Sequence, residues 1–181
     1  MEAAEPAREP VEIPSDRFRV LVPSPIGPLA LELEGLAVVR LLVAPKPTSL
    51  DGFAPLGKGA AADAVEEAVG RLAEYFAGAR KKLELDFEPA LADLDPFARR
   101  ILREACRVPY GKTRSYRDLA SVLGRADDAD AVRAVLLANP VPILVPCHRL
   151  ILGSGKIGAW VGGSERKRWL LTLEREGQDA V

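Results

Sequence analysis

The segment ILVPCHRLI (143–151) places one of the chain's two cysteines, Cys147, directly before its only histidine, His148. A thiolate is a strong nucleophile, and an imidazole is the side chain best suited to accept its proton near neutral pH. Neighbouring side chains of an extended strand point to opposite faces, so direct contact between sulfur and ring is not expected. The pair indicates nucleophilic chemistry in which the histidine acts around a turn or through a water molecule. A carboxylate elsewhere would then orient its second nitrogen.

The two cysteines are expected to have different roles. Free cysteine is among the most often buried residue types, so Cys106, which lies in a patterned helical segment, is interpreted as a core residue. Cys147 differs because Pro146 precedes it and the charged pair His148 and Arg149 follows, a pattern that a buried strand does not tolerate. A metal site is not expected, because the chain has a single histidine and no CxxC pattern.

Length and composition place the chain among globular proteins. Its 181 residues suffice for one large domain or two small ones, and 48% hydrophobic with 28% charged residues indicates a soluble chain with a core. No apolar run has the length of a membrane span, no signal peptide is evident, and only two cysteines occur, so a cytoplasmic protein is expected. Asn139, Gln178 and Met1 are single representatives of their types, and this depletion of heat-labile residues favours a thermophilic source.

The net charge of −1 conceals an uneven distribution. Residues 1–90 contain 10 Lys and Arg against 15 Asp and Glu, whereas residues 91–181 contain 15 against 11. A basic second half is typical of proteins that bind polyanions, although differences of this size also arise by chance. The charge distribution leaves both interpretations open.

The first half of the chain is predicted to be a small α+β domain over residues 17–90, preceded by a mobile tail over residues 1–16. Alternating and β-branched residues predict three strands, near 18–23, 29–34 and 37–43, with a turn at Gly35. A helix that stops before Gly78 is predicted from the helical spacing of Val65, Val69, Leu72 and Phe76. A further strand is predicted near 83–88.

The second half, residues 91–181, is predicted to be mainly helical. The last two helices are expected over residues 129–138 and about 165–176. The signals that begin or end the four predicted helices are Asp95-Pro96, the capping-box pair Ser115 and Asp118 with Gly124, Asn139-Pro140, and Ser164. Two short helices joined by a tight turn favour a helix-turn-helix, whose second helix would enter a DNA groove.

Three segments together carry a family resemblance. NPVPILVPCHRLI (139–151) resembles the active-site signature of the 6-O-alkylguanine-DNA alkyltransferases, VPYGKTRSYRDLASVLG (108–124) resembles the segment before their recognition helix, and GAWVGGSERKRWLLTLEREG (158–177) resembles the loop and final helix that close their pocket. In the first half, SPIGPLALELEG and LAEYFAG are similar to the family's less conserved amino-terminal domain. The resemblance therefore spans nearly the whole chain.

The resemblance implies a fold and a reaction. The fold is α+β, a small strand-rich amino-terminal domain followed by a mainly helical, winged-helix-like helix-turn-helix domain. The reaction moves the alkyl group of O6-alkylguanine in DNA irreversibly to a cysteine of the protein, after the nucleotide has been flipped out of the stack. The thioether product has no good leaving group, so one turnover would end the activity of the chain. A monomer that needs no cofactor, metal or protein partner is expected, with alkylated duplex DNA as its substrate.

The resemblance also implies roles for individual residues. Cys147 is the nucleophile, and His148 activates it through a water molecule while Glu174 holds the imidazole in the required tautomer. Asn139 braces the turn that carries the cysteine, and Tyr116 stands at the pocket mouth, where it assists extrusion of the nucleotide. The residues expected at the guanine, through side chains or backbone groups, are Tyr116, Leu136, Leu150, Trp160 and Val161. Those expected at the DNA are Arg117, Ala129, Asp130, Arg133 and Arg149.

The expected recognition helix departs from the family pattern. Asp130 occupies the position at which the family carries an arginine that fills the vacated base stack. Arg133, at a normally small position one turn further on, either replaces that arginine or pairs with Asp130. Asp127 and Asp128 crowd the same turn, where carboxylates cap helix amides and suit the helix dipole but would also face phosphates.

Two other functions stay open beside DNA repair. Because the recognition helix is acidic, the same thiol chemistry could act on free alkylguanine, nucleosides or single strands instead of duplex DNA. Trp160 stands where the family usually has a smaller aromatic residue and would reshape the alkyl pocket. A non-catalytic helix-turn-helix module that binds lesions or operators is the third possibility. Retention of Cys147, His148, Asn139 and Glu174 together argues against it.

Overall fold

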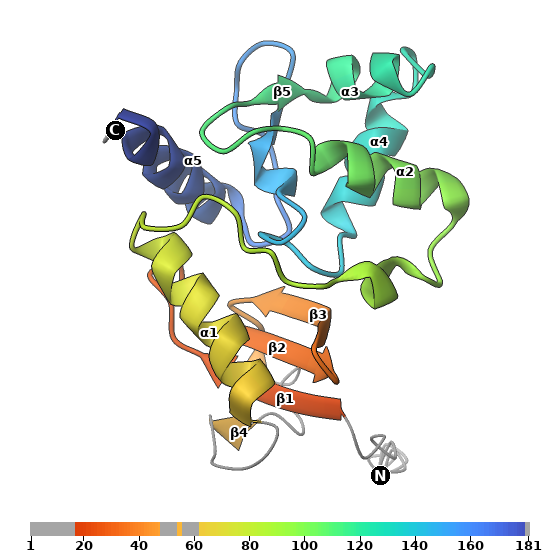
Figure 1. Ribbon diagram of the computed structural model, residues 1–181. Coiled ribbons are helices and arrows are strands. Elements are labelled where there is room, and N and C mark those ends of the chain that lie inside the picture. Colours follow the sequence, from red (N-terminus) through yellow and green to blue (C-terminus); the bar gives the residue numbers. More distant parts are fainter. Residues whose placement is uncertain (1–16, 48–53, 56–61, 180–181) are drawn as a thin grey trace, which may run out of the picture.

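The computed structural model describes residues 17–47, 54–55 and 62–179 (Figure 1). The predicted tail at residues 1–16 lies outside these ranges. A sheet and one helix form the strand-rich first half, drawn at the bottom of Figure 1, and the second half above them is mainly helical. The α+β prediction is therefore confirmed. Within the described ranges, no helix is both long and apolar enough to span a membrane.

The sheet is an antiparallel meander with one short parallel addition. Its strands β1 (Arg17–Val22), β2 (Leu29–Glu34) and β3 (Ala37–Val43) agree with the three predicted strands, and β4 (Ala54–Pro55) pairs with β1 in parallel. The order is β3-β2-β1-β4. The β2–β3 turn passes through Gly35, whose φ of 57° is a conformation that glycine adopts without a Cβ penalty.

Helix α1 (Ala62–Phe76) supplies one wall of the core and later a residue of the site. Its buried positions Val65, Ala68, Leu72 and Tyr75 recur at intervals of three and four, which places them on one helix face. Figure 1 shows α1 lying along the sheet, with its end near Tyr75 pointing toward the helical half.

The strand predicted near 83–88 is wrong. This segment runs beside β3 and forms one backbone bond to it, from Val38 N to Asp86 O at 2.8 Å, but it joins no ladder. Glu84 has a φ of 54°, which breaks the extended conformation, and the guanidinium of Arg71 bonds the carbonyls of Leu83 and Glu84 instead. A short 3₁₀ turn, η2 (Glu88–Leu91), follows.

Two of the predicted cap signals, Asp95 and Ser115, begin helices of the second half, whereas Ser164, expected as a cap, is itself the first residue of the last helix. The helices of this half are α2 (Pro96–Ala105), α3 (Tyr116–Val122), α4 (Ala129–Leu137) and α5 (Ser164–Asp179). The Asp95 carboxylate accepts the amide of Phe97, and Ser115 and Asp118 form the reciprocal capping box. Helix α4 lacks such a cap, because Asp128 at its N-cap pairs with Arg125 at 2.9 Å rather than with helix amides. Helices α3 and α4 pack together as the predicted helix-turn-helix.

The two halves share a core and several bonds. Their buried apolar side chains form one cluster, and Leu41 N of β3 donates to Pro140 O beside the cysteine turn at 2.8 Å. From α5, the guanidinium of Arg166 reaches Ile26 O at 2.6 Å. Strands β5 (Arg114–Ser115) and β6 (Leu150–Ile151) pair in parallel and tie the start of α3 to the segment after Cys147. A domain boundary at residue 90 stays a prediction.

Candidate active site

The turn that carries Cys147 is held by one amide side chain. Asn139 is buried, its Oδ1 accepts Val141 N at 3.0 Å, and its Nδ2 donates to Val145 O at 3.1 Å. Within the same turn, the β-branched Ile143 has a φ of 78°, which is a strained conformation for that residue type. Because Asn139 bonds both sides of the turn, it fixes the place where Cys147 begins the 3₁₀ turn η3 (Cys147–Arg149).

The thiol of Cys147 lies among hydrogen-bond donors. It is 2% exposed, and Asn139 Nδ2 and Trp160 Nε1 each lie 3.1 Å from its sulfur. Burial raises the pKa of this thiol, while the two donors and the charge of Lys167 act in the opposite direction. The donors are therefore arranged for a thiolate, but a base is needed to form it.

The neighbouring imidazole has the form of such a base. His148 is fully buried, and its Nε2 lies 2.8 Å from Glu174 Oε1. Burial lowers the pKa of His148, which keeps the ring neutral, although Glu174 acts in the opposite direction. A neutral ring that donates Nε2–H to a carboxylate leaves Nδ1 with its lone pair, and Nδ1 is buried with no partner among the described residues.

Glu174 is the point where several elements meet. Burial would raise the pKa of its carboxyl, but the hydrogen bond from His148 and the hydrogen bonds and charge of Arg149 outweigh this and hold the pKa well below its usual range. Its Oε2 accepts the backbone amide of Gly111 at 3.0 Å, and its Oε1 accepts the hydroxyl of Tyr75 at 2.7 Å. The carboxylate is therefore ionised, although it has no exposed surface.

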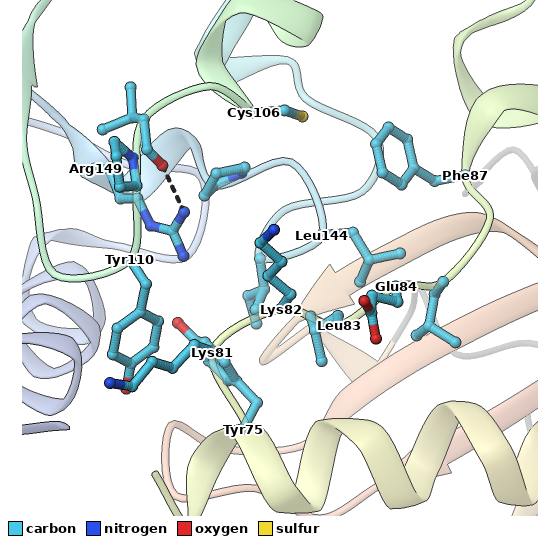
Figure 2. Close-up of a pocket in the computed structure, with 15 residues that line it drawn as sticks. Tyr75, Lys81, Lys82, Leu83, Glu84, Phe87, Cys106, Tyr110, Leu144 and Arg149 are labelled. Carbon is cyan, nitrogen blue, oxygen red and sulfur yellow. Dashed lines mark hydrogen bonds between the residues drawn. The ribbon is translucent and has the colours of Figure 1, made fainter. Parts of the chain in front are cut away.

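The prediction that Arg149 contacts DNA is wrong. This guanidinium is buried, and it binds Glu174 through Nε at 2.9 Å and Nη2 at 2.8 Å. Its Nη1 donates to Val108 O at 2.7 Å (Figure 2). Arg149 instead neutralises the buried carboxylate that orients His148. Sequence reasoning assigned it to the surface because arginine is rarely buried without such a partner.

A buried lysine beside Tyr116 was missed. Lys167 Nζ donates to Leu150 O at 2.5 Å and to Tyr116 OH at 3.0 Å, and its side chain has no exposed surface. Burial lowers its pKa to about 8. The sequence held a signal: Lys167, Leu170 and Glu174 lie three and four residues apart, so a lysine shares the buried face of α5. Guanine was expected to contact backbone groups near Leu150. The carbonyl of Leu150 already accepts a hydrogen bond from Lys167, so a guanine bound there would have to share it.

The remaining predicted guanine contacts lie around this centre. Leu136, Leu150 and Trp160 are buried, and the Nε1–H of Trp160 donates the hydrogen bond to the Cys147 sulfur described above. Val161 is 43% exposed and lines a cavity of about 400 Å³ between Asn139 and the end of β3. The structure thus brings Trp160 to the reacting sulfur and leaves Val161 at the surface.

The predicted DNA residues of the helix-turn-helix line one hollow. A cavity of about 460 Å³ lies between α3 and α4, and its walls include Tyr116, Arg117, Ala129, Asp130 and Arg133. Within the described part of the chain, Arg133 makes no ion pair with Asp130, and its Nε is buried without a partner. The pairing interpretation of Arg133 is therefore wrong, and Arg133 lines the hollow together with Tyr116.

The free energy of unfolding should fall as the pH drops from about 7 to about 5. His148 has a lowered pKa when folded, so below the ordinary histidine pKa of about 6.5 the unfolded chain binds a proton that the folded chain does not. Protonation then favours the unfolded state. Because His148 is the only histidine, His148→Asn should flatten this dependence. Chemical denaturation across this pH window checks it, and equal slopes in both proteins would contradict it.

Known proteins match both the sequence and the fold. The family model described as 6-O-methylguanine DNA methyltransferase, DNA binding domain, matches residues 96–176. A methylated-DNA–protein-cysteine methyltransferase of Mycobacterium tuberculosis is 40% identical over 156 residues, 85% of this chain and 90% of that protein. A DNA base-flipping protein of Thermus thermophilus is 40% identical over 153 residues, 84% of this chain and 97% of that protein.

Two solved structures resemble the described fold. The crystal structure of the M. tuberculosis O6-methylguanine methyltransferase aligns with a TM-score of 0.76 at 33% identity, and it covers 91% of this chain and 96% of its own. The M. tuberculosis protein in complex with DNA aligns with a TM-score of 0.75 at 35% identity, and it covers 88% of this chain and 94% of its own. The likeness therefore extends over both halves of the chain.

Proposed function

The chain belongs to the family of methylated-DNA–protein-cysteine methyltransferases, and on that basis we propose that it repairs O6-alkylguanine in DNA by moving the alkyl group to its own Cys147. The observation that carries this proposal is the buried Cys147 thiol, which has two hydrogen-bond donors on its sulfur and stands beside a neutral imidazole. A protein that only binds lesions has no use for a nucleophile prepared in this way. The non-catalytic alternative is therefore disfavoured.

The reaction follows from the groups in place. The Cys147 proton passes, through a water molecule, to the free Nδ1 of His148, and Glu174 stabilises the imidazolium through Nε2. The thiolate attacks the alkyl carbon, a C–S bond forms, and the bond from that carbon to guanine O6 breaks. The guanine leaves with the electron pair of that bond and takes up a proton, which the imidazolium gives up through the water, so that His148 becomes neutral again. The sulfur becomes a thioether, which nothing in the reaction reverses.

The remaining parts of the proposal concern partners and place. The substrate is duplex DNA, supported by the helix-turn-helix and by the relative solved with DNA. We further propose that the chain acts as a monomer in the cytoplasm and needs no cofactor or protein partner. The direct test is a duplex with one O6-methylguanine: the amount of guanine restored should equal the amount of protein added. Restoration of several guanines per chain, or of none, would contradict the proposal.

Arg133→Ala should slow repair of a duplex by about tenfold or more, while transfer from free O6-methylguanine stays close to the native rate. Only the duplex needs its flipped base held out, and Arg133, whose Nε has no hydrogen-bond partner among the described residues, lines the α3–α4 hollow beside Tyr116. Single-turnover rates on both substrates check this. Equal slowing on duplex and free base would reject a role for Arg133 in the stack.

Asp130→Ala is the companion variant. Removing a carboxylate from the same hollow should strengthen duplex binding, because that carboxylate repels the phosphates. The gain should be larger at low salt, since at high salt ions already screen this repulsion. Binding of unmodified duplex at two salt concentrations measures the effect. A gain of similar size at both would contradict an electrostatic cause.

A further inference from the structure

Helix α1, from the strand-rich half, places a hydroxyl inside the active site. Tyr75 is 1% exposed, and its OH donates to Glu174 Oε1 at 2.7 Å. The same hydroxyl oxygen lies 3.5 Å from His148 Nε2. The hydroxyl therefore stands at the point where the carboxylate and the imidazole meet.

This hydroxyl keeps its proton and donates it to the carboxylate. Burial raises the pKa of Tyr75 well above its ordinary value, and the negative charge of Glu174 acts in the same direction. Oε1 accepts from three groups, Tyr75, His148 and Arg149, whereas Oε2 accepts from Arg149 and the Gly111 amide. Arg149 thus bonds both oxygens of the carboxylate, whereas Tyr75 bonds only Oε1, the oxygen that also faces His148 Nε2.

A neighbouring tyrosine shows what packing alone provides. The rings of Tyr75 and Tyr110 meet edge to face with centroids 6.1 Å apart, and both line a cavity of about 510 Å³ with Arg149 (Figure 2). Tyr110 OH is buried, yet it has no hydrogen-bond partner among the described residues. The two tyrosine rings lie in the same environment. They differ in that the hydroxyl of Tyr75 donates a hydrogen bond to Glu174, whereas that of Tyr110 does not.

We propose that Tyr75 is a positioning residue for alkyl transfer: its hydroxyl keeps Glu174 Oε1 against His148 Nε2, so that Nε2 retains the proton and Nδ1 stays free to accept the proton of Cys147. This inference rests on the proposed function, and it gives the amino-terminal half a part in the chemistry. Without the hydroxyl, Oε1 loses one of its three donors and is held less firmly against Nε2, and the neutral imidazole then populates both tautomers.

The test compares Tyr75→Phe with Tyr110→Phe. Each variant removes one buried hydroxyl and keeps the ring, so both retain the aromatic packing. Because the chain has one histidine, ¹⁵N spectra of its ring report the tautomer of His148 without assignment from other residues. Single-turnover transfer is measured on duplex and on free O6-methylguanine, and thermal unfolding monitors the fold.

Tyr75→Phe should show a mixture of imidazole tautomers and a limiting rate about tenfold lower on both substrates, with substrate affinity unchanged. Tyr110→Phe should match the native spectrum and rate. A native tautomer and rate in Tyr75→Phe, or equal losses in the two variants, would overturn the proposal. The spectra need no substrate, so they decide the role of Tyr75 even if the native protein fails to take up an alkyl group, a result that would refute the proposed function instead.

Discussion

Replacing Cys147 with alanine should abolish alkyl transfer completely, whereas Cys106→Ala should leave its rate unchanged. The Cys147 sulfur has two donors and an adjacent neutral imidazole. Cys106 is an exposed residue at the end of α2, but its thiol faces the cavity of Figure 2, whose walls desolvate it and raise its pKa to about 11. At neutral pH this thiol therefore stays protonated.

Intact-mass analysis of the two variants after incubation with alkylated duplex measures this difference. Cys106→Ala is the matched control, because it removes the chain's other thiol and leaves the Cys147 turn intact. An added alkyl mass in Cys147→Ala would show that another group is the acceptor. Loss of transfer in Cys106→Ala would show that the second thiol takes part.

Glu174→Gln should slow transfer by about 100-fold or more and also destabilise the fold. The amide keeps the shape of the side chain but carries no charge to stabilise the imidazolium of His148, and it leaves Arg149 buried beside a neutral group. Breaking a buried ion pair on one side typically costs about 3–5 kcal/mol of stability. Both losses have the same origin, the negative charge of a carboxylate with no exposed surface.

Chemical denaturation and single-turnover rates measure the two losses separately. Glu176→Gln is the control, because this glutamate lies exposed on the same helix α5. The stabilisation by Glu174 should be fully present above the ordinary glutamate pKa of about 4.3 and should be lost progressively as the pH falls from there toward the much lower pKa of the folded carboxyl. A Glu174→Gln protein with native stability at neutral pH would refute the charge network.

Local signals in the sequence sufficed for much of the fold. The alternation in residues 29–34, the turn glycine Gly35 and the capping box at Ser115 each depend on residues close in sequence, and the structure contains all three features. The strand predicted near 83–88 failed because its alternation is real but Glu84 adopts a positive φ, which no local pattern announces. The proposed catalytic pair, Cys147 and His148, could be predicted because both lie in one short motif.

The residues that sequence reasoning misplaced depend on contacts between distant segments. Arg149 pairs with Glu174 across 25 positions, and Tyr75 reaches the same carboxylate across 99 positions. Cys106 was expected in the core, but it follows the last residue of α2 and is exposed. Periodicity identifies which face of a helix is buried, but it does not identify the partner that lets a charged or hydroxyl group be buried there.

The central claim, that Cys147 accepts one alkyl group and is then spent, is tested most directly by intact-mass analysis of the native chain with excess duplex carrying O6-methylguanine. The mass should rise by one methyl group per chain and then stay constant, and peptide mapping should place the methyl group on Cys147. More than one methyl group per chain, a methyl group on any other residue, or repaired duplex beside an unmodified chain would contradict the account.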